Sequence, residues 1–315
     1  MDAISFDNIR AAAGRIDAVF LNSPTATADS LDAALGCQVV AKVELANPVG
    51  SFKGRGTEYL AATALAAGEP VTCASAGNFG QGLARAATRR GHACTVFAAE
   101  TANPVKIDAM RRLGAQVRLA GRDFDAAKQA AREYARFSGS RYIEDGAEPA
   151  IAEGAGTIAL ELLANERFDT ILVQLGNGAL LAGVGTVLRR LAARTQIVAV
   201  VAENAPAMKL SLEAHRAVET PAANTMADGM AVRVPIAATL PLLAQCCDEV
   251  VSVSEAQMMA AMRLIRGSLE LTVEPSGAAG IAAILREPRK YAGRRVATIL
   301  SGGNISQELL QQLQP

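Results

Sequence analysis

Between an apolar run and a helix-forming run, the chain reads NPVGSFKGRG from Asn47 to Gly56. The apolar residues Val39, Val40, Ala41 and Val43 before it are typical of a strand, and the residues Glu58–Ala67 after it favour a helix. Lys53 therefore stands at a strand-to-helix junction. The glycines around it leave room for a bulky planar partner and permit unusual backbone angles.

A lysine at such a junction has two interpretations. It can be a solvated residue at the start of a helix, which is the ordinary case for Ser-Phe-Lys alone. It is also the side chain that forms a Schiff base with a carbonyl cofactor such as pyridoxal phosphate. The other motifs of the chain favour the second interpretation.

The composition excludes several classes of function. The chain has 315 residues, half of them hydrophobic, which suffices for one large or two medium cores. Its 31 basic and 31 acidic residues balance, and its aromatic content of 4% is low, so nucleic-acid binding is not expected. We expect no signal peptide and no membrane segment, because no uncharged apolar stretch reaches about 18 residues.

The cysteines and histidines are few. The five cysteines lack metal-type spacing, and their odd number favours reduced thiols in a cytoplasmic protein. Only His92 and His215 are available, so we do not expect a histidine-based metal cluster or a hydrolase triad. We expect His92 in a loop at a helix end and His215 in a polar helix, both without a catalytic role.

Short apolar runs alternate with longer amphipathic runs, which predicts an α/β fold with parallel sheets covered by helices on both faces. The number of strands favours two doubly wound sheets. Residues 72–143 would form a small domain, and residues 1–71 with 144–315 a large one. The expected strands are Val71–Ala74, Cys94–Ala98, Gln116–Leu119, Tyr142–Glu144, Ile171–Leu175, Ile197–Ala202, Glu249–Val253 and Val296–Leu300. The expected helices are Gln81–Arg90, Pro104–Leu113, Phe124–Phe137, Ile151–Asn165, Leu180–Ala193, Ala207–Arg216, Glu255–Arg266 and Gly277–Leu285.

Three further strand-to-helix turns are rich in glycine: Ala74–Gly82, Gly176–Gly183 and Leu300–Asn304. In parallel sheets such turns lie at the carboxyl ends of strands, where ligands bind. The turn at Gly176 directly follows an apolar run and opens a helix. Its small residues let N–H groups converge on a phosphate, although an ordinary tight loop is equally compatible. Because neither a G-x-G-x-x-G motif nor a Walker lysine motif occurs, a different phosphate-bearing cofactor fits best.

Taken in order, these motifs resemble those of the fold-type II pyridoxal-phosphate enzymes, in the threonine/serine dehydratase and serine racemase-like branch. The resemblance covers nearly the whole chain. It implies a tryptophan synthase beta-like fold, with the cofactor in the cleft between two doubly wound domains. It also implies pyridoxal 5'-phosphate as cofactor, an amino acid as substrate and a cytoplasmic homodimer.

The resemblance also implies roles for individual residues. Lys53 would be the Schiff-base lysine, beside Phe52, and Ser301 would hydrogen-bond the pyridine nitrogen. The phosphate loop would comprise Gly176, Asn177, Gly178, Ala179 and Leu180, where a side chain at position 178 would intrude on the phosphate. Ser75, Ala76, Gly77, Asn78 and Phe79 would hold the substrate carboxylate, with Asn78 also near the phenolic oxygen. Gly229 of the motif 227–229 and Glu274 of the motif 274–277 would lie beside the ring.

The implied activity is that of a lyase. A β-hydroxy amino acid of the L-threonine or L-serine type would lose water and then ammonia to give a 2-oxo acid. Lys53, once displaced by the substrate, would remove the Cα proton. Ser301 is a neutral partner for the ring nitrogen, which favours prompt β-elimination over transamination.

Several positions depart from the family pattern. Racemases carry a second catalytic serine where this chain has Ala76, so racemisation is disfavoured. Metal-activated members carry acidic ligands where this chain has Val201 and Ala207, so no metal site is expected. Dehydratases usually have a histidine where Phe79 stands, which leaves the substrate open. Because the chain ends soon after Ser301, we expect no C-terminal regulatory domain.

Three alternatives remain open. The first is a β-replacement transferase of the cysteine-synthase kind, which the Asn47-Pro48 pair favours, whereas the motifs 75–78 and 227–229 favour a dehydratase. The second is a dehydratase for another β-hydroxy amino acid, such as 3-hydroxyaspartate. The third is a non-catalytic nucleotide or metabolite binder, which Lys53 argues against.

Overall fold

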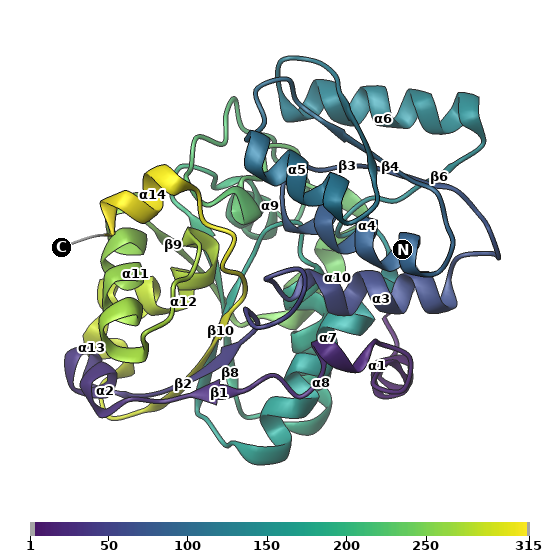
Figure 1. Cartoon of the computed structure of the whole chain (residues 1–315). Helices are drawn as coiled ribbons and strands as arrows, with labels where there is room; N and C mark the ends of the chain where they lie inside the picture. Colours follow the sequence, from purple (N-terminus) through teal and green to yellow (C-terminus); the bar gives the residue numbers. More distant parts are fainter. Residues whose placement is uncertain (1–3, 314–315) are drawn as a thin grey trace.

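The computed structural model describes residues 4–313 and contains two sheets (Figure 1). The larger has the strand order β1-β2-β10-β7-β8-β9, and only β1 runs antiparallel to its neighbour. The smaller has the order β5-β4-β3-β6 and is parallel throughout. The strands of the larger sheet are β1 (Thr25–Ala26), β2 (Gln38–Val43), β7 (Thr170–Gln174), β8 (Gln196–Ala202), β9 (Glu249–Val253) and β10 (Arg295–Leu300). Those of the smaller are β3 (Val71–Ala74), β4 (Cys94–Ala98), β5 (Gln116–Leu119) and β6 (Arg141–Tyr142).

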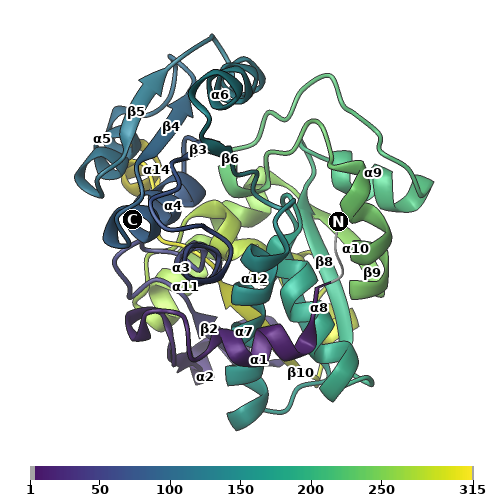
Figure 2. The same ribbon diagram turned by 90° about the vertical axis from the view of Figure 1, so that its right-hand side faces the viewer.

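Helices cover both faces of each sheet, as Figure 2 shows for the larger one. In β8, Ile197, Ala199 and Val201 join one hydrophobic core, whereas Val198 and Val200 join the other. This alternation explains the continuous apolar sequence of the strand, because both of its faces are buried. The helices are α1 (Phe6–Ala12), α2 (Asp29–Leu35), α3 (Lys53–Thr63), α4 (Asn78–Arg89), α5 (Pro104–Arg112), α6 (Phe124–Ser138), α7 (Pro149–Asn165), α8 (Ala179–Leu191), α9 (Ala207–Ala214), α10 (Leu240–Cys246), α11 (Glu255–Leu269), α12 (Pro275–Arg286), α13 (Pro288–Tyr291) and α14 (Gln307–Gln312).

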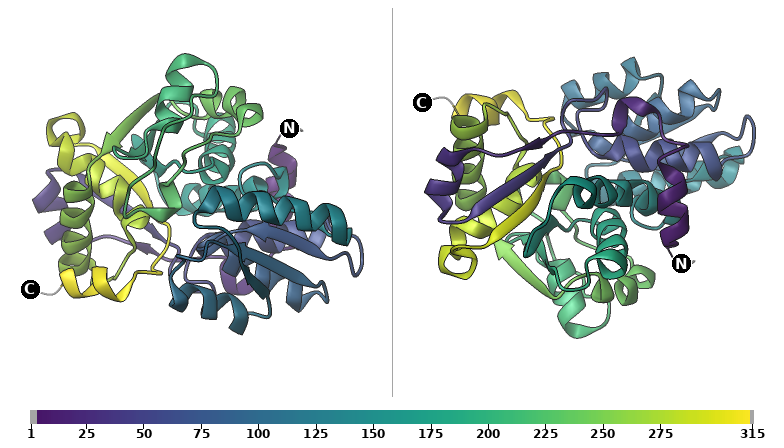
Figure 3. Two further views of the ribbon diagram at one scale, coloured as in Figure 1. Left: turned by 90° about the horizontal axis from the view of Figure 1, so that it is seen from above. Right: turned by 90° about the horizontal axis from the view of Figure 1, so that it is seen from below.

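The layers are assigned by the contacts between elements. Helices α1, α3, α7 and α8 pack together on one side of the larger sheet, and α2, α11, α12 and α13 on the other. In the smaller sheet, α6 covers one face while α4 and α5 cover the other (Figure 1). Views from above and below show the smaller unit beside the larger sheet (Figure 3). The two units therefore meet along an edge, where the turns of both can face one cavity.

The helix after the lysine motif begins earlier than the sequence suggests. We expected it from Glu58, but α3 begins at Lys53 itself. Gly54 and Gly56 are helical residues at points of close packing, where a Cβ atom would collide with the ring of Phe20 or the backbone of Ile151. These glycines allow α3 to pack closely against its neighbours and do not form a turn. The expected start of the helix was therefore wrong.

The expected strand at residues 142–144 is also shorter than its apolar pattern suggests, because β6 ends at Tyr142. The smaller sheet takes its strands from residues 71–142, and the larger sheet from both sides of that segment. The domain boundaries themselves stay a prediction, since α3 packs on both α4 and α7.

The surroundings of the cysteines and histidines suit structural roles. The five thiols are free; Cys37, Cys73, Cys94 and Cys246 are buried and Cys247 is partly buried. The Nδ1 atom of His92 lies 3.1 Å from the carbonyl oxygen of Glu69. His215 ends α9 in the left-handed conformation, so it caps the helix instead of lying within it. Between residues 4 and 313, no helix is long and apolar enough to cross a membrane.

Candidate active site

The four glycine-rich turns line one cavity of about 270 Å³. Every residue that the sequence assigned to the cofactor or the substrate lies on its wall. The fold thus brings together segments that are up to 249 positions apart, from Phe52 to Ser301. The assigned residues on the wall are Phe52, Lys53, Ser75, Ala76, Gly77, Asn78, Phe79, Gly176, Asn177, Gly178, Ala179, Leu180, Gly229, Glu274 and Ser301.

Lys53 reaches the cavity from the first turn of α3. The N–H group of Phe52 donates to the carbonyl oxygen of Ser301 (3.0 Å), which ties the lysine turn to the turn after β10. The Nζ atom of Lys53 lies 2.6 Å from Oδ2 of Asp145, and 4.9 Å and 5.9 Å from the ring centres of Phe52 and Phe79. The amine is therefore held by one carboxylate between two aromatic rings.

The sequence reasoning missed Asp145. This residue follows β6 and lines the cavity. The signal was available, because ligand-binding residues of parallel sheets come after the carboxyl ends of strands. We instead read residues up to 144 as strand and assigned no role to the acidic residue next to them.

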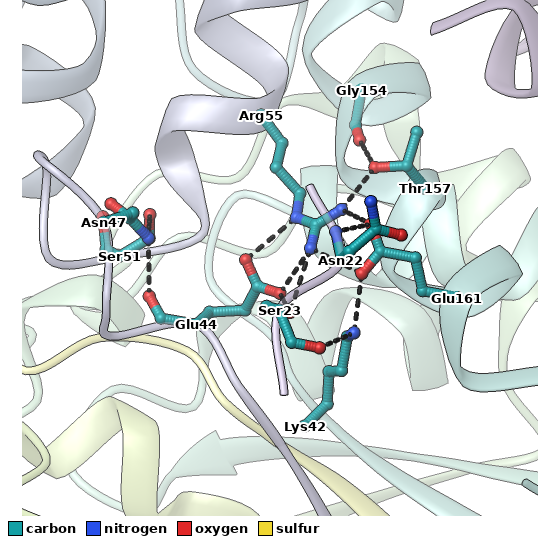
Figure 4. Close-up of polar contacts among 10 residues, drawn as sticks. All are labelled: Asn22, Ser23, Lys42, Glu44, Asn47, Ser51, Arg55, Gly154, Thr157 and Glu161. Carbon is teal, nitrogen blue, oxygen red and sulfur yellow. Dashed lines mark hydrogen bonds and ion pairs between the residues drawn. The ribbon is translucent and has the colours of Figure 1, made fainter. Parts of the chain in front are cut away.

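A buried ionic cluster anchors the helix that carries Lys53 (Figure 4). The guanidinium of Arg55 is fully buried and makes two hydrogen bonds with the carboxylate of Glu44, at 2.9 and 2.8 Å. It makes two more with Glu161 of α7, at 2.6 and 2.9 Å. The hydroxyls of Ser23 and Thr157 accept from it at 3.0 Å each. Arg55 thereby joins α3 to the end of β2 and to α7, two residues after Lys53.

The turn before α4 is closed by its own serine. The Oγ atom of Ser75 accepts hydrogen bonds from the N–H groups of Gly77 (3.2 Å) and Gly80 (2.9 Å). Asn78 is the first residue of α4, and the side chain of Phe79 is buried although it lines the cavity. A loop in this form presents backbone groups at a helix start, where a carboxylate is favoured.

A chain of amides connects three of the four turns. Asn78 donates to Oε1 of Glu274 (2.7 Å) and accepts from Asn304 (2.7 Å), which also donates to the carbonyl oxygen of Val49 (2.8 Å). Glu274 is buried, and this burial raises its pKa to about 8, with the charge of Asp228 acting in the same direction. The carboxyl group is therefore mainly protonated at pH 7. The sequence reasoning gave no role to Asn304.

The loop 176–180 has the geometry of an anion cup. Gly178 caps α8 with φ = +101°, a conformation that favours glycine. The N–H groups of Ala179, Leu180 and Leu181 donate no hydrogen bond to any described residue. Such free amides at the start of a 13-residue helix suit a phosphate group.

Replacing Gly178 by valine should weaken cofactor binding strongly, but for a different reason from the one expected. A Cβ atom at this position would lie 2.6 Å from Cδ1 of Leu243, outside the cup, and the positive φ would add about 1–3 kcal/mol of strain. The cup would deform rather than be filled. Titration of the cofactor-free protein with pyridoxal phosphate should show at least a tenfold loss of affinity, and a smaller loss for Asn177→Ala. Equal affinity in the Gly178 variant would contradict the assignment.

Two ion pairs connect the units at the rim of the cavity. Lys106 of α5 pairs with Asp228, which lines the cavity, and Arg233 pairs with Asp125 near the start of α6. Phe124, also on the wall, precedes Asp125. The cations of Lys106 and Arg233 thus lie close to the cavity.

The walls suit a polar, phosphate-bearing aldehyde. The amine of Lys53 supplies a nucleophile and α8 supplies an anion cup. Four buried oxygen atoms of residues on the wall have no hydrogen-bond partner among the described residues: Oγ of Ser276, Oε2 of Glu274, Oδ1 of Asp145 and Oε1 of Gln174. Because buried polar atoms are normally paired, they fit a polar ligand in this cavity.

The positions at which metal-activated members carry acidic ligands are apolar in this chain. Val201 and Ala207, where metal-activated members carry acidic ligands, are fully buried apolar residues. Residues 4–313 contain no group of three or more His, Cys, Asp or Glu side chains placed to hold a metal ion. The absence of a metal activator stays a prediction.

Comparison with known proteins agrees with this geometry. The family model described as "Pyridoxal-phosphate dependent enzyme" matches residues 16–302. An L-threonine ammonia-lyase of Geobacter sulfurreducens is 37% identical, over 86% of this chain and 68% of its own length. A β-hydroxyaspartate dehydratase of Paracoccus denitrificans is 29% identical, over 97% of this chain and 98% of its own. The solved structure of threonine deaminase isoform 2 from Solanum lycopersicum, in its processed form, superposes with a TM-score of 0.89 at 31% identity, covering 99% of this chain and 94% of that one.

A two-sheet α/β fold whose glycine-rich turns and Lys53 line one cavity, together with these similarities, defines a pyridoxal-phosphate enzyme of fold type II. The chain belongs to the family of pyridoxal-phosphate dependent enzymes. This confirms the resemblance inferred from the motifs, and it confirms pyridoxal phosphate as the cofactor.

Proposed function

We propose that this enzyme is a lyase that dehydrates and deaminates a β-hydroxy amino acid of the L-threonine or L-serine type, giving a 2-oxo acid and ammonia. One observation carries the proposal: the Lys53 amine, the carboxylate loop 75–79 and the anion cup 176–180 line the same cavity. The similarity to an L-threonine ammonia-lyase supports the same conclusion.

Each group has a defined task in this proposal. When bound, pyridoxal phosphate draws electrons from the Cα atom of the amino acid, which makes the Cα proton removable. Lys53 would hold the cofactor covalently through Nζ and would take the Cα proton once it is free. The amides that open α8 would bind the phosphate, and the loop 75–79 would bind the substrate carboxylate. Ser301, which is uncharged, would be the partner of the ring nitrogen and so favour elimination.

The test is a panel of amino acids assayed for 2-oxo acid and ammonia. L-threonine and L-serine should each release both products in equal amounts. A transferase of the cysteine-synthase kind would instead require a second nucleophile and give a β-substituted amino acid. A purified protein that binds pyridoxal phosphate but releases no oxo acid from any β-hydroxy amino acid would contradict the proposal.

A dehydratase for 3-hydroxyaspartate is a second candidate. It is favoured by the similarity to a β-hydroxyaspartate dehydratase over nearly the full length of both chains. The same panel distinguishes the candidates, because kcat/KM for 3-hydroxyaspartate would then exceed that for L-threonine.

Racemisation should be barely detectable in the wild type. Ala76 lines the cavity without a hydroxyl, where a racemase needs one for the face opposite Lys53. Ala76→Ser changes the volume little, so the fold should survive, and it should raise racemase activity measurably. The assay incubates both proteins with L-serine in heavy water and follows D-serine, deuterium at Cα and pyruvate. Substantial D-serine from the wild type would contradict this interpretation.

We also propose that the enzyme works in the cytoplasm as a homodimer. Free, buried thiols suit a reducing compartment. The homodimer rests on the family resemblance. Light scattering on the purified protein tests it, with twice the mass of one chain as the expected result and the mass of a single chain as the contrary one.

A further inference from the structure

Asp145 is the carboxylate closest to the Lys53 amine, and the proposed cofactor and substrate contacts do not involve it. Three carboxyl groups line the cavity: Asp145, Asp228 and Glu274. Asp228 is committed to Lys106 at the rim, and Glu274 accepts from Asn78. Of these three groups, Asp145 alone contacts the Lys53 amine, at 2.6 Å.

Both oxygen atoms of Asp145 have a defined environment. Oδ2 accepts from Lys53, whereas Oδ1 is buried and has no partner among the described residues. The next residue, Gly146, lets this loop pack closely against the anion cup. Its φ is +89°, and a Cβ atom there would lie 2.5 Å from the carbonyl oxygen of Asn177. Asp145 is therefore held between the lysine and the anion cup on the wall of the cavity, and one of its oxygen atoms has no partner within the described protein.

We propose that Asp145 is a catalytic residue that carries a proton from Lys53 to the leaving hydroxyl group of the substrate. This inference rests on the proposed lyase function. A hydroxyl group leaves readily only as water, so the reaction needs an acid at the β-oxygen. The Asp145 carboxylate, hydrogen-bonded to the atom that collects the Cα proton, is placed to pass this proton on.

Each proton released in this sequence is taken up by Lys53, Asp145 or the leaving oxygen. Lys53, as a free amine, takes the Cα proton and becomes an ammonium ion. Oδ2 of Asp145 takes one proton from Nζ, which restores the amine. The neutral carboxyl group gives its proton to the β-oxygen as the Cβ–O bond breaks and its electron pair leaves with oxygen. Water departs, and Asp145 is again a carboxylate.

The test compares a leaving group that needs a proton with one that does not. Asp145→Asn keeps the shape but cannot carry the proton. On L-serine, kcat should fall about 10²–10³-fold, within the range for a lost acid–base group, whereas on β-chloro-L-alanine, which expels chloride, it should change less than about threefold. Asp145→Ala serves as a second variant. Glu144→Gln removes the neighbouring carboxylate, which pairs with Lys128 outside the cavity, and should leave the ratio of the two activities unchanged.

Labelling of the cofactor-free protein gives a readout independent of turnover. Asp145→Asn removes the ion-pair partner of Lys53, so acetic anhydride at pH 7 should acylate Lys53 severalfold faster, as measured by peptide mass spectrometry. An unchanged rate of Lys53 acylation would show that Asp145 does not pair with Lys53. Equal losses on both substrates would overturn the proton transfer alone. A wild type that expels chloride but eliminates water from no β-hydroxy amino acid would overturn the proposed lyase function, and this role with it.

Discussion

Lys53→Ala should cut turnover by several powers of ten and abolish covalent attachment of the cofactor. Two tasks are lost together, because the proposed attachment point and the proposed base for the Cα proton are the same nitrogen atom. The side chain lies at the cavity wall at the start of α3, so its truncation should leave the fold intact. Pyridoxal phosphate should still bind through the anion cup, but more weakly.

The measurement combines kinetics with chemical trapping. Borohydride treatment of the wild-type holoenzyme should fix the cofactor on the peptide that contains Lys53, and the variant should give no such peptide. Lys209→Ala is the matched control, because Lys209 faces Glu213 on the partly exposed surface of α9. It should retain turnover and trapping. Cofactor fixed on any other lysine of the wild type would refute the assignment.

Arg55→Met should lower the free energy of unfolding by about 3–5 kcal/mol, the cost of removing one partner from a buried ion pair. The variant leaves the carboxylates of Glu44 and Glu161 without the guanidinium that pairs both of them. Lys42, 2.6 Å from Glu161, compensates only one of the two. Denaturant unfolding of the cofactor-free protein measures the loss.

The loss of unfolding free energy in Arg55→Met should be smaller at acidic pH. Burial alone would raise the pKa of Glu161, but the hydrogen bonds and charges of Arg55 and Lys42 outweigh it and lower that pKa below the ordinary value of 4.5. The stabilisation from this group is therefore present above pH 4.5 and is lost as the pH falls through the lower, folded-state pKa. In the variant the pairing with Arg55 is gone, so its stability should depend less steeply on pH in this range.

Two further substitutions show how much of the lost stability comes from the buried ion pairs of Arg55. Arg55→Lys keeps the charge without the planar fork and should fall between wild type and Arg55→Met. Arg111→Met removes an arginine whose partner, Asp108, is exposed, and should change stability by less than about 1 kcal/mol. A loss at Arg55 no larger than the loss at Arg111 would show that the buried cluster does not stabilise the fold.

Sequence reasoning was most accurate for the strands, whether buried, as β3 is, or largely exposed, as β5 is. The bounds of β3, β4, β5 and β9 agree with the expected runs. The short β1 was missed because its two residues, Thr25 and Ala26, carry no apolar pattern. Helix starts were the weakest point, since Gly54 and Gly56 were read as turn residues although both are helical.

The family, the fold class and most residues of the cavity wall were determined by the sequence alone, because a strand-to-helix turn that binds a ligand is a local motif. Contacts between distant segments were decided only by the tertiary structure. Asp145 meets Lys53 across 92 positions, and Glu161 meets Arg55 across 106. No spacing rule predicts such pairs, because they depend on how α3, α7 and the two sheets pack. The proton path that we propose therefore became visible only in the folded chain.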